Sequence, residues 1–135
     1  MITAEHYAKR YVLWCGRGQS YDQLPRRQRD RWILLHAISR QFSADDVLSE
    51  KEVNQRIQDW LLGPGSTMHV DRVSIRRELI DGGFLQRDPA GKEYRRASGY
   101  ERVFGFEPDV EKLDLPELVK KEKSRIRERN TRHQD

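Results

Sequence analysis

Glycine and proline divide the middle of this chain into short segments, and that division limits the fold more than any other feature of the sequence. Gly63-Pro64-Gly65 and Gly82-Gly83 each follow a run whose apolar residues repeat with helical spacing. A third break, Asp88-Pro89-Ala90-Gly91, has the residues of a tight turn and separates two short runs typical of strands. The predicted order is therefore two helices before the first break, one helix after it, and then a β-hairpin.

Signals at the segment ends place the three helices. Pro25 fits the first turn of a helix whose apolar face carries Ile33, Leu34, Ala37, Ile38 and Phe42. Ser49 and Glu52 have the spacing of a capping box, which predicts a second helix from that point to Gly63. A flexible stretch from Gly63 to His69 is expected next. The third helix is predicted over residues 71–81, with Asp71 as its N-terminal cap.

The two ends of the chain have weaker patterns. Tyr7, Tyr11 and Trp14 at i, i+4 and i+7 predict a short amphipathic helix over residues 4–14, which straps the core. Residues 100–106 are expected as a strand or turn, because Tyr100, Val103, Phe104 and Phe106 can pack in extended backbone. Residues 115–129 are predicted to form an exposed helix capped by Asp114, which docks through a narrow apolar stripe or frays.

This order of elements predicts an α+β, mainly α fold of the winged helix-turn-helix type, with three helices, a β-hairpin wing and extensions at both ends. Leu, Ile, Val and Phe account for 31 of 135 residues, which suffices for one modest core. The predicted organisation is an N-terminal helical arm (1–24), a winged-helix-like domain (25–97) and a charged C-terminal extension with a helix (98–135).

Five stretches of the predicted domain also resemble a known family. They are Leu24-Pro25, Leu48-Ser49-Glu50-Lys51-Glu52-Val53-Asn54, Ile75-Arg76-Arg77-Glu78-Leu79-Ile80-Asp81, Gly83-Phe84-Leu85-Gln86-Arg87 and Tyr94-Arg95-Arg96. Together they resemble an uncharacterised bacterial domain of unknown function that is found alone or joined to helix-turn-helix transcriptional regulators. The resemblance implies a winged-helix-like fold and a regulatory setting, but no biochemical activity.

The charge of the chain is unevenly distributed. The net charge is +4 and the isoelectric point is about 9.4. Residues 25–42 carry a local charge of +4, residues 72–96 carry +3, residues 101–117 carry −4 and residues 120–135 carry +4. Basic stretches attract polyanions, although many of them are only solvated surface.

Binding to DNA is the leading functional hypothesis. The predicted contact residues lie at the start of the first long helix, on the third helix and on the hairpin: Arg26, Arg27, Arg29, Ser74, Arg77, Lys92, Arg95 and Arg96. On a helical projection Arg72 and Arg76 fall in the buried sector, and Arg76 is expected to pair with a carboxylate such as Glu52 or Glu78. The basic tail from Lys120 to Arg132 is a further candidate.

The third helix also favours an alternative. Its outward sector carries Asp71, Glu78 and Asp81, which repel phosphate, so the wing and the arms are expected to contribute most to DNA binding. The alternative that this acidic face favours is a winged-helix adaptor that binds a protein partner, without specific DNA contacts. A homodimer formed through one of the arms is possible in either case.

Catalytic, cofactor and metal functions are not expected. His6, His36, His69 and His133 are far apart in sequence and Cys15 is the only cysteine, so no zinc pattern is present. Gly63-Pro64-Gly65-Ser66-Thr67 lacks the lysine of a phosphate-binding loop. His36 is expected to be a hydrogen-bonding group at the core edge. No signal peptide or apolar stretch of membrane-spanning length is found, which favours a cytoplasmic protein.

Overall fold

The structure is a computed structural model that describes residues 1–97 and 105–134. It is mainly helical with one small antiparallel sheet, which confirms the α+β, mainly α prediction. The predicted strand or turn over Tyr100, Val103 and Phe104 lies outside the described residues. In chain order the elements are α1 (Ala4–Gly16), α2 (Gln28–Ser39), α3 (Glu50–Leu62), α4 (Arg72–Asp81), β1 (Leu85–Arg87), β2 (Tyr94–Arg96), the 3-10 helix η1 (Pro108–Lys112) and α6 (Leu115–Gln134).

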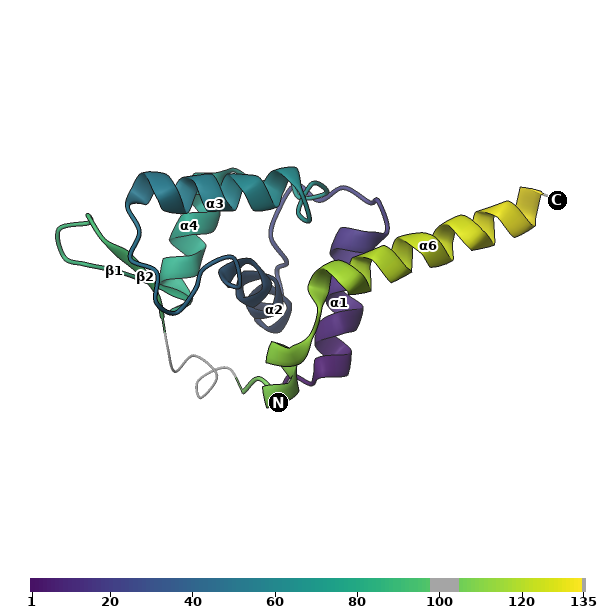
Figure 1. Ribbon diagram of the computed structural model, residues 1–135, viewed down its shortest axis with the longest axis horizontal. Helices are drawn as coiled ribbons and strands as arrows, with labels where there is room; N and C mark the ends of the chain where they lie inside the picture. The colour runs from purple at the N-terminus through teal and green to yellow at the C-terminus, as the bar shows by residue number, and fades with distance from the viewer. Residues whose placement is uncertain (98–104, 135) are drawn as a thin grey trace.

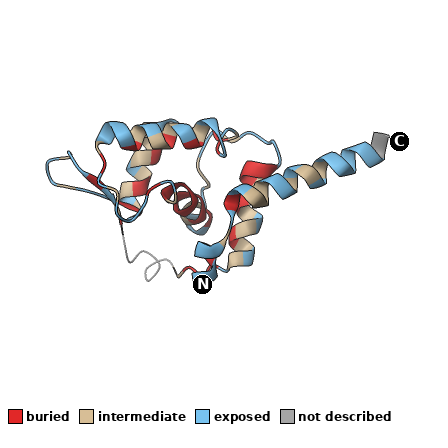
Figure 2. Ribbon diagram, viewed as in Figure 1, coloured by how far each residue is buried: buried red, intermediate tan, exposed pale blue. Residues whose placement is uncertain are grey.

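Helix α2 forms the centre of the core. Every residue from Ile33 to Ser39 is buried, and Figure 2 shows most of this helix in the colour of buried residues. Helices α1 and α4 both pack against it (Figure 1). Enclosure on several sides explains why its apolar residues occupy a face wider than that of an ordinary surface helix.

The prediction that Pro25 occupies the first turn of α2 is wrong. The helix begins at Gln28, and its N-cap residue Arg27 has extended backbone with no side-chain capping bond. The Nε of Arg31 instead donates a hydrogen bond of 3.1 Å to the carbonyl oxygen of Pro25. A side chain from the first turn of α2 thus bonds the backbone of the preceding segment, which does not join the helix.

Both helices that follow begin at the predicted caps. At α3 the Ser49 hydroxyl accepts from the backbone N–H of Glu52, and the Glu52 carboxylate accepts from the backbone N–H of Ser49, so the capping box is complete. At α4 the Asp71 carboxylate accepts from the backbone N–H of Ser74 at 2.9 Å. These local signals are confirmed because each involves residues only three positions apart.

The hairpin follows α4 through the glycine pair. Gly83 has a φ of +81°, in the left-handed region that glycine favours, and it turns the chain from α4 into β1. Strands β1 and β2 pair with Leu85 opposite Arg96 and Arg87 opposite Tyr94. Leu48, between α2 and α3, forms an antiparallel bridge with Tyr94, with hydrogen bonds of 2.9 and 2.7 Å. The hairpin is therefore anchored to the segment that precedes α3.

The N-terminal helix belongs to the core. Tyr7, Tyr11 and Trp14 are all buried, which confirms the predicted strap. The loop after α3 is tied to this region, because the Thr67 hydroxyl donates to the carbonyl of Trp14 at 2.7 Å and Met68 bridges to Tyr21. The flexible stretch predicted there is instead held by specific contacts.

Helix α6 packs on α1 only over its first turns, where Leu115 is buried and Leu118 and Val119 are half-buried. Asp114 caps it as predicted, accepting from the backbone N–H of Glu117 at 3.2 Å. The helix then extends away from the body as a long exposed rod (Figure 1). Among the described residues, no helix combines the length and the apolar character needed to cross a membrane.

Candidate nucleic-acid interface

Helix α4 exposes one of its two predicted contact residues. Arg77 is exposed. The hydroxyl of Ser74 donates to the Asp71 carboxylate at 2.7 Å, so it completes the helix cap. Hydrogen bonds from the side chain and the backbone of Ser74 lower the pKa of Asp71. Among the described residues Arg77 forms no such hydrogen bond. It is therefore the predicted contact residue of α4 that faces solvent.

Of the other two arginines of α4, only Arg72 differs from the helical projection. Arg72 is exposed at the first position of the helix. Arg76 is structural as predicted, with a side chain that is 13% exposed. Its carboxylate partner is Glu50 at 3.0 Å, and it also donates to the Asn54 side chain at 2.6 Å. The predicted pairing with a carboxylate is present, but its partner is neither of the two examples: Glu52 serves the α3 cap, and Glu78 lies 4.0 Å from Arg31.

Helix α4 and the start of α2 lie next to each other. The guanidinium of Arg31 is 4.0 Å from the carboxylate of Glu78, and it also holds the carbonyl of Pro25. The Arg31 guanidinium partly neutralises the charge of Glu78, one of the two acidic side chains within α4. The contact also places residues 25–31 beside α4. Arg26 and Arg27 are exposed. Arg29 is exposed too, and it donates to the carbonyl of Met1 at 3.2 Å.

The hairpin exposes two of its three predicted contact residues. Lys92 and Arg95 are exposed, and Arg95 is 3.7 Å from Glu93. The Asp88 carboxylate shapes the turn by accepting from the backbone N–H groups of Lys92 and Glu93 at 2.7 and 3.0 Å. The bond from the Glu93 N–H contributes most to the lowered pKa of Asp88. Arg87 on β1 is also exposed and adds a cation that the sequence analysis did not select.

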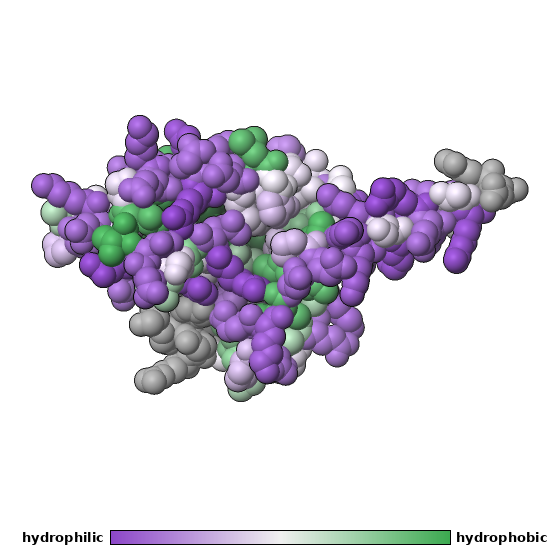
Figure 3. Space-filling model, in the orientation of Figure 1, coloured by the Kyte–Doolittle hydropathy of each residue, from purple (hydrophilic) through white to green (hydrophobic). Residues whose placement is uncertain are grey.

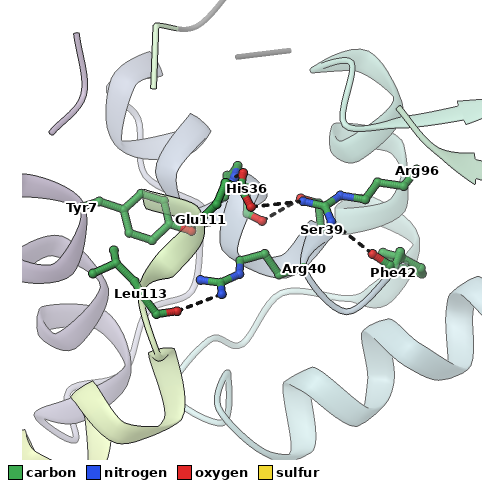
Figure 4. Close-up of polar contacts among 8 residues, drawn as sticks. All are labelled: Tyr7, His36, Ser39, Arg40, Phe42, Arg96, Glu111 and Leu113. Atoms are coloured by element: carbon green, nitrogen blue, oxygen red, sulfur yellow. Dashed lines mark hydrogen bonds and ion pairs between the residues drawn. The ribbon is translucent and has the colours of Figure 1, made fainter. Parts of the chain in front are cut away.

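Arg96 turns inward. Its side chain is 18% exposed, lies 3.9 Å from Glu111 and donates to the carbonyl of Phe42 at 3.4 Å (Figure 4). The acidic 3-10 helix η1 therefore covers this arginine. Arg40 is held in the same region, where it donates to the carbonyl of Leu113 at 2.8 Å. Of the predicted contact residues, Arg96 is the one least available to an external ligand.

Glu111 also reaches the buried histidine of α2. The Nε2 of His36 is 2.8 Å from the carboxylate, and its Nδ1 is 2.7 Å from the Tyr7 hydroxyl (Figure 4). Because a carboxylate only accepts hydrogen bonds, the Nε2 of His36 is the donor to Glu111. The hydrogen-bonding role predicted for His36 is confirmed, although this imidazole is fully buried.

The contacts of Arg31, Arg40 and Glu111 were missed by the sequence analysis. Glu111 and His36 are 75 positions apart in the chain, and Arg40 and Leu113 are 73 apart. No local pattern reports a pairing over such a separation. The one available signal was the acidic composition of residues 101–117, which marked this segment as a partner for cations.

The described residues hold no group of three histidine, cysteine or carboxylate side chains placed to bind a metal ion. Cys15 is buried, and burial raises the pKa of its thiol to about 12. A thiol with this pKa stays protonated at neutral pH and is a poor nucleophile.

The comparisons with known proteins give one match. Residues 21–96 match a family described as an uncharacterised protein conserved in bacteria (DUF2087). Searches of curated proteins and of solved structures returned no significant match. The matched region runs from the residue that bridges to Met68 to the end of the hairpin, and it covers more than half of the 135 residues. The chain therefore belongs to this uncharacterised bacterial family.

Proposed function

We propose that the protein is a bacterial winged-helix protein that binds DNA and acts in transcription regulation in the cytoplasm. In this proposal α2, α3 and α4 are the three helices, β1 and β2 form the wing, and α4 is the helix presented to the major groove. The extra bridge between Leu48 and Tyr94 supports this assignment, because it adds an extended residue between the first two helices to the edge of the wing.

The observation that carries the proposal is a set of exposed cations without partners. Arg26, Arg27, Arg77 and Lys92 are exposed, and within residues 1–97 and 105–134 none of them has a carboxylate at ion-pairing distance. They belong to the three segments that a winged helix turns toward DNA. Lys9 and Lys112 are exposed as well, but they lie 3.1 and 3.3 Å from an acidic neighbour.

A salt-dependent binding assay on random duplex DNA tests the proposal. The test variant is Arg77→Ala with Lys92→Ala, and the control is Lys9→Ala with Lys112→Ala, which changes the net charge by the same amount. Each neutralised phosphate contributes about 0.9 to the slope of log K against log salt. The test variant is expected to lower that slope by up to about 1.8, and the control by much less.

Equal slopes for the two variants would contradict the proposal, because the change would then reflect total charge alone. Arg96→Ala offers a second comparison. Since this side chain is covered by η1, its loss is expected to reduce stability more than DNA affinity.

A second candidate function is an adaptor that binds a protein partner, and the exposed Asp81 on α4 favours it. Asp81→Lys separates the two functions. If α4 faces DNA, the added cation raises DNA affinity; if this face serves a protein partner, DNA affinity stays unchanged. The predicted homodimer stays a prediction, which sedimentation of the full chain tests.

A further inference from the structure

The C-terminal half of α6 extends beyond the body of the protein. Contact with α1 reaches Glu122, whose side chain meets Gly16 and lies 3.6 Å from Arg17. Residues 127–132 are all exposed. We refer to residues 124–132 as the overhang; Figure 3 shows it covered mainly by hydrophilic side chains. A helix held only at one end gains no stability from burial along its free part.

This part of α6 carries more basic than acidic side chains, and few of the basic side chains have an acidic partner. Residues 120–132 carry seven basic side chains and two acidic ones, Glu122 and Glu128. Glu122 pairs with both Arg17 and Arg125. On the described chain no other residue of this stretch forms an ion pair. The excess charge is therefore exposed and uncompensated.

The cations divide between two sides of the helix. At 100° per residue, Lys120, Lys123 and Arg127 fall within about 60° of one another on a side that carries no carboxylate. We call these three residues the unopposed side. Lys121, Arg125, Arg129 and Arg132 lie on the other side, around Glu122 and Glu128.

Apolar surface is too scarce for a second copy or a lipid surface to cover the overhang. Beyond Val119 the only large apolar residue of the described helix is Ile126. A partner helix needs an apolar seam repeated every three to four residues, and an interfacial helix needs an apolar face. A second copy would also bring two cationic helices together. A polyanion is the partner that this charge complements.

We propose that the unopposed side of α6 binds the phosphates of double-stranded DNA without regard to sequence. The inference rests on the proposed function for its partner, but it assigns a separate contact surface. Cations at i and i+4, such as Lys123 and Arg127, repel each other along a free helix, and phosphates between them would remove that repulsion. Ser124 and Asn130 add hydrogen-bond donors near the same surface.

Two charge-matched variants of the full chain test this assignment on a random 30-base-pair duplex. The first replaces Lys120, Lys123 and Arg127 with glutamine, and the second replaces Lys121, Arg129 and Arg132. Glutamine keeps the helix propensity of the original residues, and circular dichroism checks that both variants retain the wild-type helix content. The first variant is expected to lower the salt slope by up to about 2.7, from three lost phosphate contacts. The second is expected to lower it by less than one.

An equal or larger effect of the second variant would overturn the assignment, and so would an unchanged slope in the first. A loss confined to one of two unrelated duplex sequences would also overturn it, because phosphate contacts do not depend on sequence. The variant Arg77→Ala with Lys92→Ala, run in parallel, keeps the two proposals apart. If that variant binds normally while the variant at Lys120, Lys123 and Arg127 does not, the winged-helix face is wrong and the contact through the unopposed side of α6 holds.

Discussion

Replacing Gly65 with alanine should destabilise the protein severely, because the loop after α3 passes directly over the indole of Trp60. A Cβ built on Gly65 lies 2.7 Å from Cη2 of that ring and closer still to Cε3 and Cζ3. Trp60 is 1% exposed, so its ring has no open space to enter. The loop is fixed as well, since Gly65 donates to the carbonyl of Trp60 at 2.7 Å and accepts from Met68 at 2.9 Å.

The magnitude follows from the two ways of relieving the overlap. Moving the loop breaks two backbone hydrogen bonds, each worth about 1 kcal/mol, and uncovers the ring. Moving the ring strains a packed core, which costs about 1 to 3 kcal/mol. We therefore expect Gly65→Ala to lower the free energy of unfolding by about 3 kcal/mol. At roughly 4 °C per kcal/mol for a chain of this size, the midpoint of thermal unfolding should fall by about 12 °C.

Urea denaturation and thermal unfolding measure the effect, and a double-mutant cycle identifies its cause. Trp60→Phe removes the ring atoms that the new methyl group would meet, so Gly65→Ala should cost much less in that background. The exposed neighbour Ser66→Ala serves as a loop control and should change stability by less than about 0.5 kcal/mol. The reasoning is refuted if Gly65→Ala costs less than about 0.5 kcal/mol, or the same in both backgrounds.

Three further predictions concern the core and the hairpin turn. Tyr7→Phe removes a hydrogen bond from the buried imidazole of His36 and should cost about 1 to 3 kcal/mol in urea denaturation; no change would show that this bond is not needed. Because burial raises the pKa of the Cys15 thiol to about 12, it should react with a thiol reagent at pH 8 only after unfolding, and rapid labelling of the native chain would contradict its buried position. The lowered pKa of Asp88 means that its stabilisation is complete above its unfolded pKa of about 4 and is lost as the pH falls through the folded value. Between pH 5 and 3 the unfolding temperature of Asp88→Asn should therefore fall less than that of the wild type. An equal fall in both proteins would assign it to other carboxylates.

The helix starts at α3, α4 and α6 were predictable because a cap is a contact between residues three positions apart. Ser49, Asp71 and Asp114 each bond the backbone that follows them, and the type of residue and its spacing specify the bond. The hairpin was predictable for a similar reason, since the turn residues and the apolar runs beside them are adjacent in sequence. Local chemistry thus specified most of the secondary structure.

The start of α2 was not predictable in this way. Pro25 is compatible with a first helical turn, but the side chain of Arg31 competes for its carbonyl oxygen. The sequence does not specify that hydrogen bond, because an arginine side chain can donate to several acceptors in the folded chain. The exposure of Arg72 was not predictable either, because a helical projection extends the buried sector along the whole helix, whereas the first residue of α4 is exposed.

The candidate site was predictable as a set of cations but not as a surface. Arg96 and Arg77 are alike in sequence, each following another arginine, yet one is covered by η1 and the other faces solvent. The difference depends on Glu111, which only the folded chain brings to the hairpin. For α6, the sequence left docking and fraying open, and the structure shows that the helix docks at its start and continues past the body as a regular helix.

Tyr7, Phe106 and Val110 complete the apolar core around α2, which has a consequence for the rest of the family. These three residues lie outside the matched region, yet they are part of one apolar cluster with the central helix inside it. A fragment trimmed to residues 21–96 would leave that helix bare along one side and prone to aggregate. Any family member without counterparts of these segments must shield the same surface by other means, such as an appended domain or a neighbouring subunit.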